Sequence, residues 1–234
     1  MSQDAFAASP SVSVGAYQPK DPAALSRAVV TAIAVHLAVT LLLILLEAVH
    51  LSVLSRFAPG GVDPHGAYLP GEQIPSLLVA AGALVQLLAL IACAFLSLKW
   101  IYRVSLNAHA LAGGMSMSPG WNVGWFFVPF ANLWFPWKGI RESWAVSADP
   151  AKWKTVKFPP ILVWWWGMWI ISGLTGSMAF RIQLNSGTVG AATASDMAVI
   201  VSNLLGLPTD VLFIVVVRRL TALQVGALAS HSLA

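Results

Sequence analysis

Residues Ser118 to Trp144 read SPGWNVGWFFVPFANLWFPWKGIRESW, and the interpretation of this stretch decides the topology of the whole chain. The stretch is apolar and aromatic, yet it contains Pro119, Pro129 and Pro136. Each proline lacks a backbone N–H and clashes with the preceding helical turn. We therefore predict that residues 121–137 do not form one continuous helix.

The composition is that of a membrane protein. Of the 234 residues, 58% are hydrophobic and 9% are charged, whereas soluble domains carry about 25% charged residues. Crossing a hydrocarbon core takes about 20 apolar residues. Suitable windows lie at about residues 28–54, 74–100, 159–180 and 196–217. The sequence predicts an all-α integral membrane protein with four transmembrane helices.

The positions of Lys and Arg place the proline-broken stretch relative to the membrane. If it does not cross, eleven of the thirteen basic residues lie on one side, and only Arg56 and Arg181 lie on the other. If it crosses, the split is five to eight. Because Lys and Arg accumulate in cytoplasmic loops, we predict four spans with both termini cytoplasmic. Residues 121–137 are then a re-entrant or interfacial segment, followed by a short amphipathic helix with Lys138 and Glu142.

We predict a single membrane domain over residues 24–224. The Ser-, Ala-, Gln- and Pro-rich residues 1–23 are expected to be a disordered tail, and residues 225–234 a C-terminal tail. The second helix is expected to extend beyond the membrane to Leu111, because Gly113-Gly114 follows.

Polar and aromatic residues gather on the predicted cytoplasmic side. We predict a polar network of Arg103, Asn107, Asn132, Arg141 and Glu142. Tryptophans favour the membrane interface, and an aromatic frame is expected from Trp100, Trp121, Trp125, Trp134, Trp137 and Trp144. Such a site would bind membrane lipids through anionic headgroups, or a membrane-protein partner or second copy of the chain. The alternative is that these side chains only fill space between helices.

Asp210 lies inside the fourth apolar window, where an ionisable group usually has a partner or faces a polar cavity. It shares a helix face with Asn203 and Gly206. We treat Asn203 and Asp210 as a candidate ion or proton site, which makes a small ion- or proton-coupled transporter or channel the alternative function. The structural alternative is that Asp210 pairs with Arg103 or Arg141, or that its carboxyl group accepts hydrogen bonds from tryptophan N–H groups.

His36, Glu47 and His50 face one side of the first window. A haem held by two histidines needs a ligand from an opposing helix, and no other window contains a histidine. We therefore expect a local hydrogen bond between His50 and Glu47, and neither a cofactor nor a metal site. Cys93 is the only cysteine, which excludes an intrachain disulfide.

Other function classes are disfavoured. The basic residues are dispersed beside the spans, so we expect no nucleic-acid partner. No motif typical of a hydrolase, a metalloprotease or a nucleotide-binding loop is present. The sequence therefore predicts a non-enzymatic binding module.

The central motifs resemble those of a known family. They are Trp100-x-Tyr102-Arg103-x-x-x-Asn107, Ser118-Pro119-Gly120-Trp121, Gly124-Trp125-Phe126-Phe127-Val128-Pro129-x-x-Asn132-Leu133-x-x-Pro136 and Glu142-x-Trp144. With the closing Val217-Arg218-Arg219-Leu220-Thr221-x-x-Gln224, this pattern resembles the bacterial membrane family called domain of unknown function 4328. The likeness covers roughly residues 77–224, with Trp137 where a tyrosine is expected. The resemblance implies a multi-pass protein of the bacterial inner membrane and supplies no activity or ligand.

Overall fold

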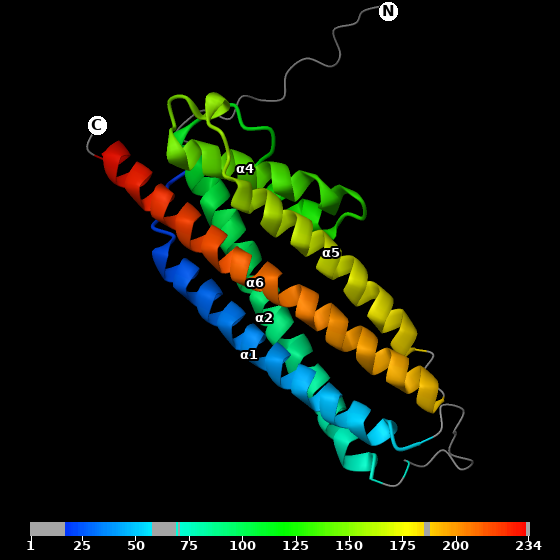
Figure 1. Ribbon diagram of the computed structural model, residues 1–234. Helices are drawn as coiled ribbons and strands as arrows, with labels where there is room; N and C mark the ends of the chain where they lie inside the picture. Colours follow the sequence, from blue (N-terminus) through cyan, green and yellow to red (C-terminus); the bar gives the residue numbers. More distant parts are fainter. Residues whose placement is uncertain (1–16, 58–68, 70, 185–187, 233–234) are drawn as a thin grey trace, which may run out of the picture. The chain divides into compact units, whose positions relative to one another are not determined.

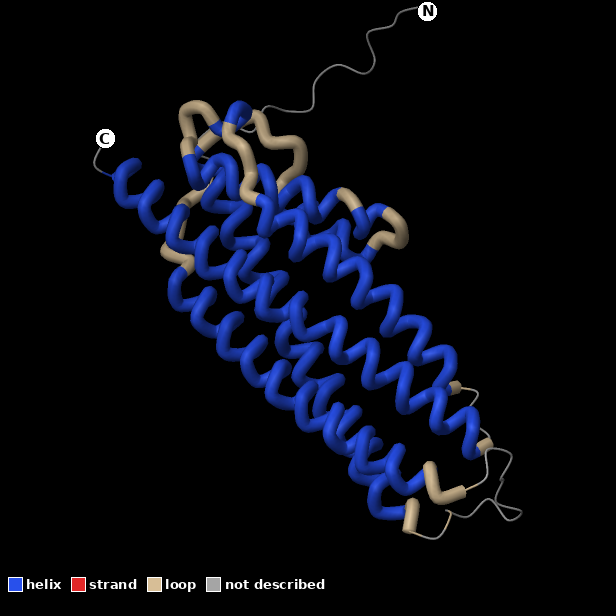
Figure 2. Tube along the Cα trace, viewed as in Figure 1, coloured by secondary structure: helices blue, strands red, loops and turns tan. Residues whose placement is uncertain are grey.

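The computed structural model describes residues 17–57, 69, 71–184 and 188–232, and no strand occurs among them (Figures 1 and 2). The long helices are α1 (Ala23–Leu54), α2 (Gln73–Leu111), α4 (Phe135–Ala148), α5 (Pro160–Gln183) and α6 (Val189–Ser232). The short ones are α3 (Pro119–Gly124) and the 3-10 turns η2 (Trp125–Phe127), η3 (Ala131–Leu133) and η4 (Trp153–Thr155).

Helices α1, α2, α5 and α6 are long and apolar enough to cross a membrane. Large apolar side chains on them are exposed, including Leu45 at 63% and Leu88 at 58%. Exposed apolar area on this scale is rare in soluble monomers and is what lipid would cover. The prediction of an all-α chain with four potential membrane helices is confirmed.

The helices extend beyond the predicted spans. Helix α6 continues past residue 217, where the fourth predicted span ends, to Ser232, so residues 225–232 of the predicted C-terminal tail are helical. Residues 1–16 of the predicted disordered tail lie outside the described residues. Residues 17–22 are described, and the Lys20 N–H donates to Asn107 Oδ1 at 3.0 Å. This bond and the start of α1 at Ala23 fix the chain earlier than predicted. The prediction that α2 reaches Leu111 is confirmed.

The described residues group into two compact units. Unit 1 comprises the described residues within 17–28, 97–159 and 217–232, and unit 2 comprises those within 29–96 and 160–216. Helices α1, α2 and α6 each contribute residues to both units. Each unit is described by itself.

In unit 2, segments of α1, α2, α5 and α6 lie alongside one another (Figure 1). Helices α5 and α6 are joined by a ring stack of Trp165 on Phe213, with centroids 4.8 Å apart. They also approach at Gly176, where an added Cβ would lie 3.5 Å from Ser202 Oγ. Small residues therefore allow these helices to pack closely.

Unit 1 is built around the part of α2 that follows Ser97. Trp100 is fully buried, and its Nε1 donates to Thr221 Oγ1 on α6 at 3.1 Å. Ala108 and Leu111 on α2 pack with Val146 on α4. These contacts join α2, α4 and α6 within the unit.

As predicted, the proline-broken stretch does not form one continuous helix (Figure 2). Pro119 and Pro136 stand in the first turns of α3 and α4, where a missing N–H is tolerated. Between them, the Ala131 N–H donates to the Pro129 carbonyl at 2.7 Å across Phe130, whose φ is +62°. This is a γ-turn, a rare and strained turn for a residue with a side chain.

Candidate functional site

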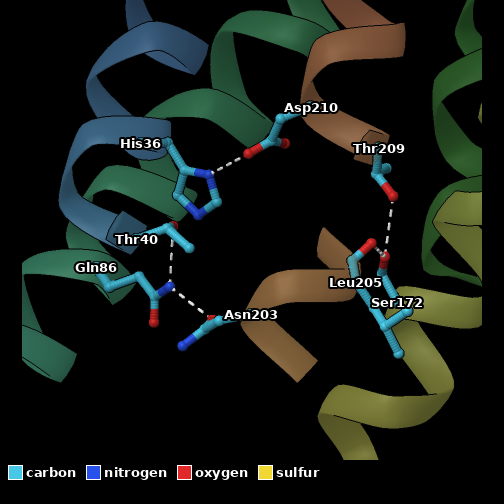
Figure 3. A network of polar contacts seen from close by, with 8 residues as sticks. All are labelled: His36, Thr40, Gln86, Ser172, Asn203, Leu205, Thr209 and Asp210. Atoms are coloured by element: carbon cyan, nitrogen blue, oxygen red, sulfur yellow. Dashed lines mark hydrogen bonds and ion pairs between the residues drawn. The ribbon is translucent and has the colours of Figure 1, made fainter. Parts of the chain in front are cut away.

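A histidine and an aspartate lie in hydrogen-bond contact inside unit 2, between α1 and α6. His36 Nδ1 is 2.8 Å from Asp210 Oδ2 (Figure 3), and the two side chains are 15% and 22% exposed. Both residues belong to apolar helices, where an unpaired charge is expensive. The partner of Asp210 is thus a histidine that the sequence analysis did not pair with it. Arg103 and Arg141, considered as partners, belong to the other unit.

A chain of side-chain hydrogen bonds lies near this pair in unit 2. Gln86 Nε2 on α2 donates to Thr40 Oγ1 on α1 and to Asn203 Oδ1 on α6, both at 3.0 Å (Figure 3). Asn203 Nδ2 is buried and makes no hydrogen bond in the described part of the chain. Three helices therefore direct uncharged polar groups into the same apolar bundle.

Helical periodicity explains why these residues meet. Thr40 lies one turn from His36 on α1, and Asn203 lies two turns from Asp210 on α6. Each helix therefore presents its polar groups on a single face. The predicted face of Asn203 and Asp210 is the one that contacts α1 and α2.

A pocket of about 200 Å³ borders the same region of unit 2. Its lining includes Glu47, Gln86 and Asn203. A water molecule occupies about 30 Å³ in the liquid, so the pocket has room for several. It therefore places a small hydratable space beside the buried Asn203 amide.

On the other side of α6, Ser172 of α5 makes two hydrogen bonds. Its Oγ lies 2.9 Å from Thr209 Oγ1 and donates to the Leu205 carbonyl at 3.2 Å (Figure 3). The carbonyl of Leu204 loses its helical donor because Pro208 has no N–H. Polar contacts of this kind support a helix around an internal proline.

In unit 1, the predicted network residue Asn107 is fully buried and fully engaged by the fold. Its Nδ2 donates to the Lys20 carbonyl at 2.8 Å and to Gln224 Oε1 at 2.9 Å. Gln224 Nε2 donates in turn to the Val104 carbonyl at 2.7 Å. The role that these bonds support for Asn107 is joining α2, α6 and the segment before α1.

Arg141 and Glu142 lie together on α4, away from those bonds. Glu142 Oε2 accepts a hydrogen bond of 3.0 Å from the Ser116 N–H. The Arg141 guanidinium lies 4.9 Å from the centre of the Phe158 ring. Of the remaining predicted residues, Arg103 lies on α2 and Asn132 in η3, and both are half-buried.

Arg141 and Glu142 line an open groove of about 500 Å³ in unit 1, called here the basic groove. Its lining residues are Arg141, Glu142, Ala145, Trp153, Lys154, Val156, Lys157 and Phe158. Three cations thus face one carboxylate, and that carboxylate already accepts a backbone hydrogen bond. The groove is suited to an anion.

The tryptophans of the predicted aromatic frame differ in exposure. Trp100 and Trp144 are buried, Trp125 and Trp137 are half-buried, and Trp121 and Trp134 are exposed. The Trp121 and Trp125 rings pack 4.8 Å apart, and Trp137 meets Phe158 edge-on at 5.7 Å. Trp137 therefore touches a residue of the basic groove.

The sequence analysis missed His36 and Gln86 as members of the polar region in unit 2. A signal for His36 was present, because it shares one face of the first window with other polar residues. Gln86 lies within a run of otherwise apolar residues from Leu77 to Leu96. Its role becomes visible only once the helices are packed.

A family model described as domain of unknown function (DUF4328) matches residues 73–222. No curated protein and no solved structure matches the chain.

Proposed function

The chain belongs to the family described as domain of unknown function (DUF4328), and we propose, from the geometry of unit 2, that it is a membrane protein that conducts protons. The family description names no activity. No catalytic step is part of this proposal. The observation that carries it is the His36–Asp210 pair between two apolar helices. Imidazole and carboxylate groups in hydrogen-bond contact can exchange a proton, and histidine changes its charge near physiological pH.

The neighbouring polar groups support a continuation of the path. Gln86 bridges α1 and α6 through Thr40 and Asn203, and Asn203 also lines the small pocket. Water in that pocket would satisfy the buried Asn203 amide. Together with the His36–Asp210 pair, these side chains and such water would form the proposed route for protons.

Proton flux across vesicle membranes tests the proposal. The protein is reconstituted into proteoliposomes containing an internal pH-sensitive dye, and a potassium gradient with valinomycin supplies the driving voltage. We expect proton uptake well above that of protein-free vesicles, and unchanged uptake for Ser177→Ala, whose exposed hydroxyl bonds only within α5. Uptake by the wild type at the protein-free rate would overturn the proposal.

The proposed orientation has four spans, with both termini cytoplasmic in a bacterial inner membrane, and residues 121–137 at the interface. The distribution of Lys and Arg supports the orientation. Exposed aromatic side chains support the interfacial position, since Phe127 is 72%, Phe130 86% and Trp134 67% exposed. A fluorescent protein fused after Asp149 is expected to fluoresce. Alkaline phosphatase activity from the equivalent fusion would contradict this topology.

A second candidate function is binding of an anionic lipid headgroup in the basic groove. Phosphate oxygens accept strong hydrogen bonds from Arg and Lys, and basic residues next to spans attract anionic lipids. The observation that favours this function is the convergence of Arg141, Lys154 and Lys157 on one groove.

Native mass spectrometry of the protein released from nanodiscs containing phosphatidylglycerol tests this second function. We expect retained phosphatidylglycerol, and much less of it after Lys154→Glu with Lys157→Glu. Lys152→Glu is the matched control, because Lys152 is exposed and does not line the groove. Equal retention by all three proteins would exclude the groove as the site.

A further inference from the structure

A compact cluster of metal-ligating side chains lies in unit 2, apart from the His36–Asp210 pair. It consists of Glu47 and His50 on α1 and Asp196 on α6, and one ligand atom from each lies within 4.8 Å of the others. The three residues are 2%, 7% and 7% exposed. His50 Nδ1 is 2.7 Å from Asp196 Oδ2.

One oxygen of this cluster is unsatisfied. Glu47 Oε2 is buried and makes no hydrogen bond within the described residues. An unpaired carboxylate oxygen in an apolar interior is costly, and such exceptions usually have a functional or ligand-related cause. We expected a local hydrogen bond between His50 and Glu47. The His50 ring nitrogens instead contact the side chains of Asp196, Ser76 and Glu72.

The donor set has the chemistry of a cation site. Two carboxylates in one buried pocket repel each other unless a proton or cation lies between them. One imidazole with two carboxylates suits zinc, manganese or iron(II) better than calcium or magnesium, which prefer oxygen ligands alone.

Neighbouring groups from α2 and the residue before it support the imidazole. Ser76 Oγ is 3.1 Å from His50 Nε2, and Glu72 Oε1 is 3.5 Å from the same nitrogen. Metal-ligating histidines characteristically have their second nitrogen held by a carboxylate or another polar group. His50 therefore has groups that fix its ring orientation.

We propose that Glu47, His50 and Asp196 bind one divalent transition-metal ion. No metal site was expected from the sequence, in which Asp196 lies 146 residues from His50. The site shares no residue with the His36–Asp210 pair, although Glu47 also lines the small pocket. Metal binding and proton flux are measured separately, so either proposal can fail without the other. It joins α1 to α6.

Isothermal titration calorimetry of the full chain tests the proposal after tag removal and EDTA treatment. Zn²⁺ and Mn²⁺ are the probes, and Mg²⁺ and Ca²⁺ are the comparison ions. We expect one transition-metal ion per chain, with a thermal unfolding midpoint that rises with metal concentration. The alkaline-earth ions should bind at least tenfold more weakly.

The variants locate the ion. Glu47→Gln and Asp196→Asn preserve shape and are each expected to weaken Zn²⁺ binding at least tenfold, and His50→Ala is expected to do the same. His231→Ala, at an exposed position outside both proposed sites, is the histidine control and should retain wild-type affinity. If His50→Ala does not fold, Zn²⁺ binding by Glu47→Gln and Asp196→Asn decides whether the ion binds at this site. The site would be overturned if the wild type did not bind Zn²⁺, or if Glu47→Gln and Asp196→Asn both bound Zn²⁺ as tightly as the wild type does. The three residues would then form a hydrogen-bonded triad only.

Discussion

His36 Nδ1 on α1 lies 2.8 Å from Asp210 Oδ2 on α6, although 174 residues separate them in the sequence. The pair joins the first and last apolar helices inside unit 2. Two titratable groups are therefore held in contact between predominantly apolar helices. We expect the pair to affect stability as well as the proposed proton conduction.

Removal of the histidine is expected to destabilise the protein. His36→Ala leaves Asp210 without its ring partner in a largely buried position, which costs about 1–3 kcal/mol. For a chain of this size, that loss lowers the thermal midpoint in detergent by roughly 2–10 °C. His231→Ala, at an exposed position, is the control and should change the midpoint little. Equal midpoints for the two variants would show that the pair does not contribute to stability.

Replacement of Gln224 is expected to weaken unit 1. Gln224 is fully buried and bonds to Asn107 and to the Val104 carbonyl. Gln224→Leu keeps a similar volume but removes both bonds from a buried site, at a cost of about 2 kcal/mol. Thermal unfolding in detergent measures the effect. Ser230→Ala on the exposed side of α6 is the control, and a loss no larger than that of Ser230→Ala would refute the role of Gln224.

Gly139 is required for the approach of α3 to α4. A Cβ at this position would lie 2.1 Å from Asn122 Oδ1 and 2.6 Å from its Cγ. Asn122 is 4% exposed and its Nδ2 donates to Ser105 Oγ, so it has little freedom to move. We expect Gly139→Ala to cost about 1–3 kcal/mol, measured as a lower thermal midpoint.

Two further variants check that the effect comes from this contact. Gly120→Ala on α3 meets nothing within 4 Å and should be nearly neutral. Asn122→Ala combined with Gly139→Ala should lose less stability than the sum of the single changes, because the clash is gone. Strict additivity would contradict the predicted contact.

Phe130 is expected to tolerate glycine better than other exposed residues do. Its φ of +62° in the γ-turn disfavours any side chain, and it is 86% exposed. Phe130→Gly relieves strain of about 1–3 kcal/mol, partly offset by the entropy of glycine in the unfolded chain. The thermal midpoint in detergent should therefore stay equal or rise. Leu133→Gly, in the neighbouring 3-10 turn, should lower it, and a larger fall for Phe130→Gly would be inconsistent with a strained turn.

Much of the fold was predictable because its signals are local in sequence. Hydropathy located the four long helices, and the prolines located the breaks around Phe130. The C-terminal part of α6, beyond residue 217, was not predictable in the same way, since its contacts are with residues of other helices. Gln224 shows this, with its partners on α2 and α4.

The pairing of helix faces could not be predicted from a single sequence. Periodicity placed Asn203 and Asp210 on one face of the fourth window, and His36 and His50 on one face of the first. Which faces meet depends on the rotation and packing of each helix against the others. The contacts of Asp210 with His36, and of Asp196 with His50, are therefore structural findings.

Proton flux through the Asp210→Asn variant is the decisive measurement for proton conduction by the His36–Asp210 pair. The amide keeps the shape of the side chain and can still hydrogen-bond to His36, but it cannot take up and release a proton. In proteoliposomes with equal amounts of folded protein, we predict that Asp210→Asn lowers voltage-driven proton uptake at least tenfold while Ser177→Ala leaves it unchanged. Wild-type uptake by folded Asp210→Asn would contradict the account and leave the His36–Asp210 pair with a structural role alone.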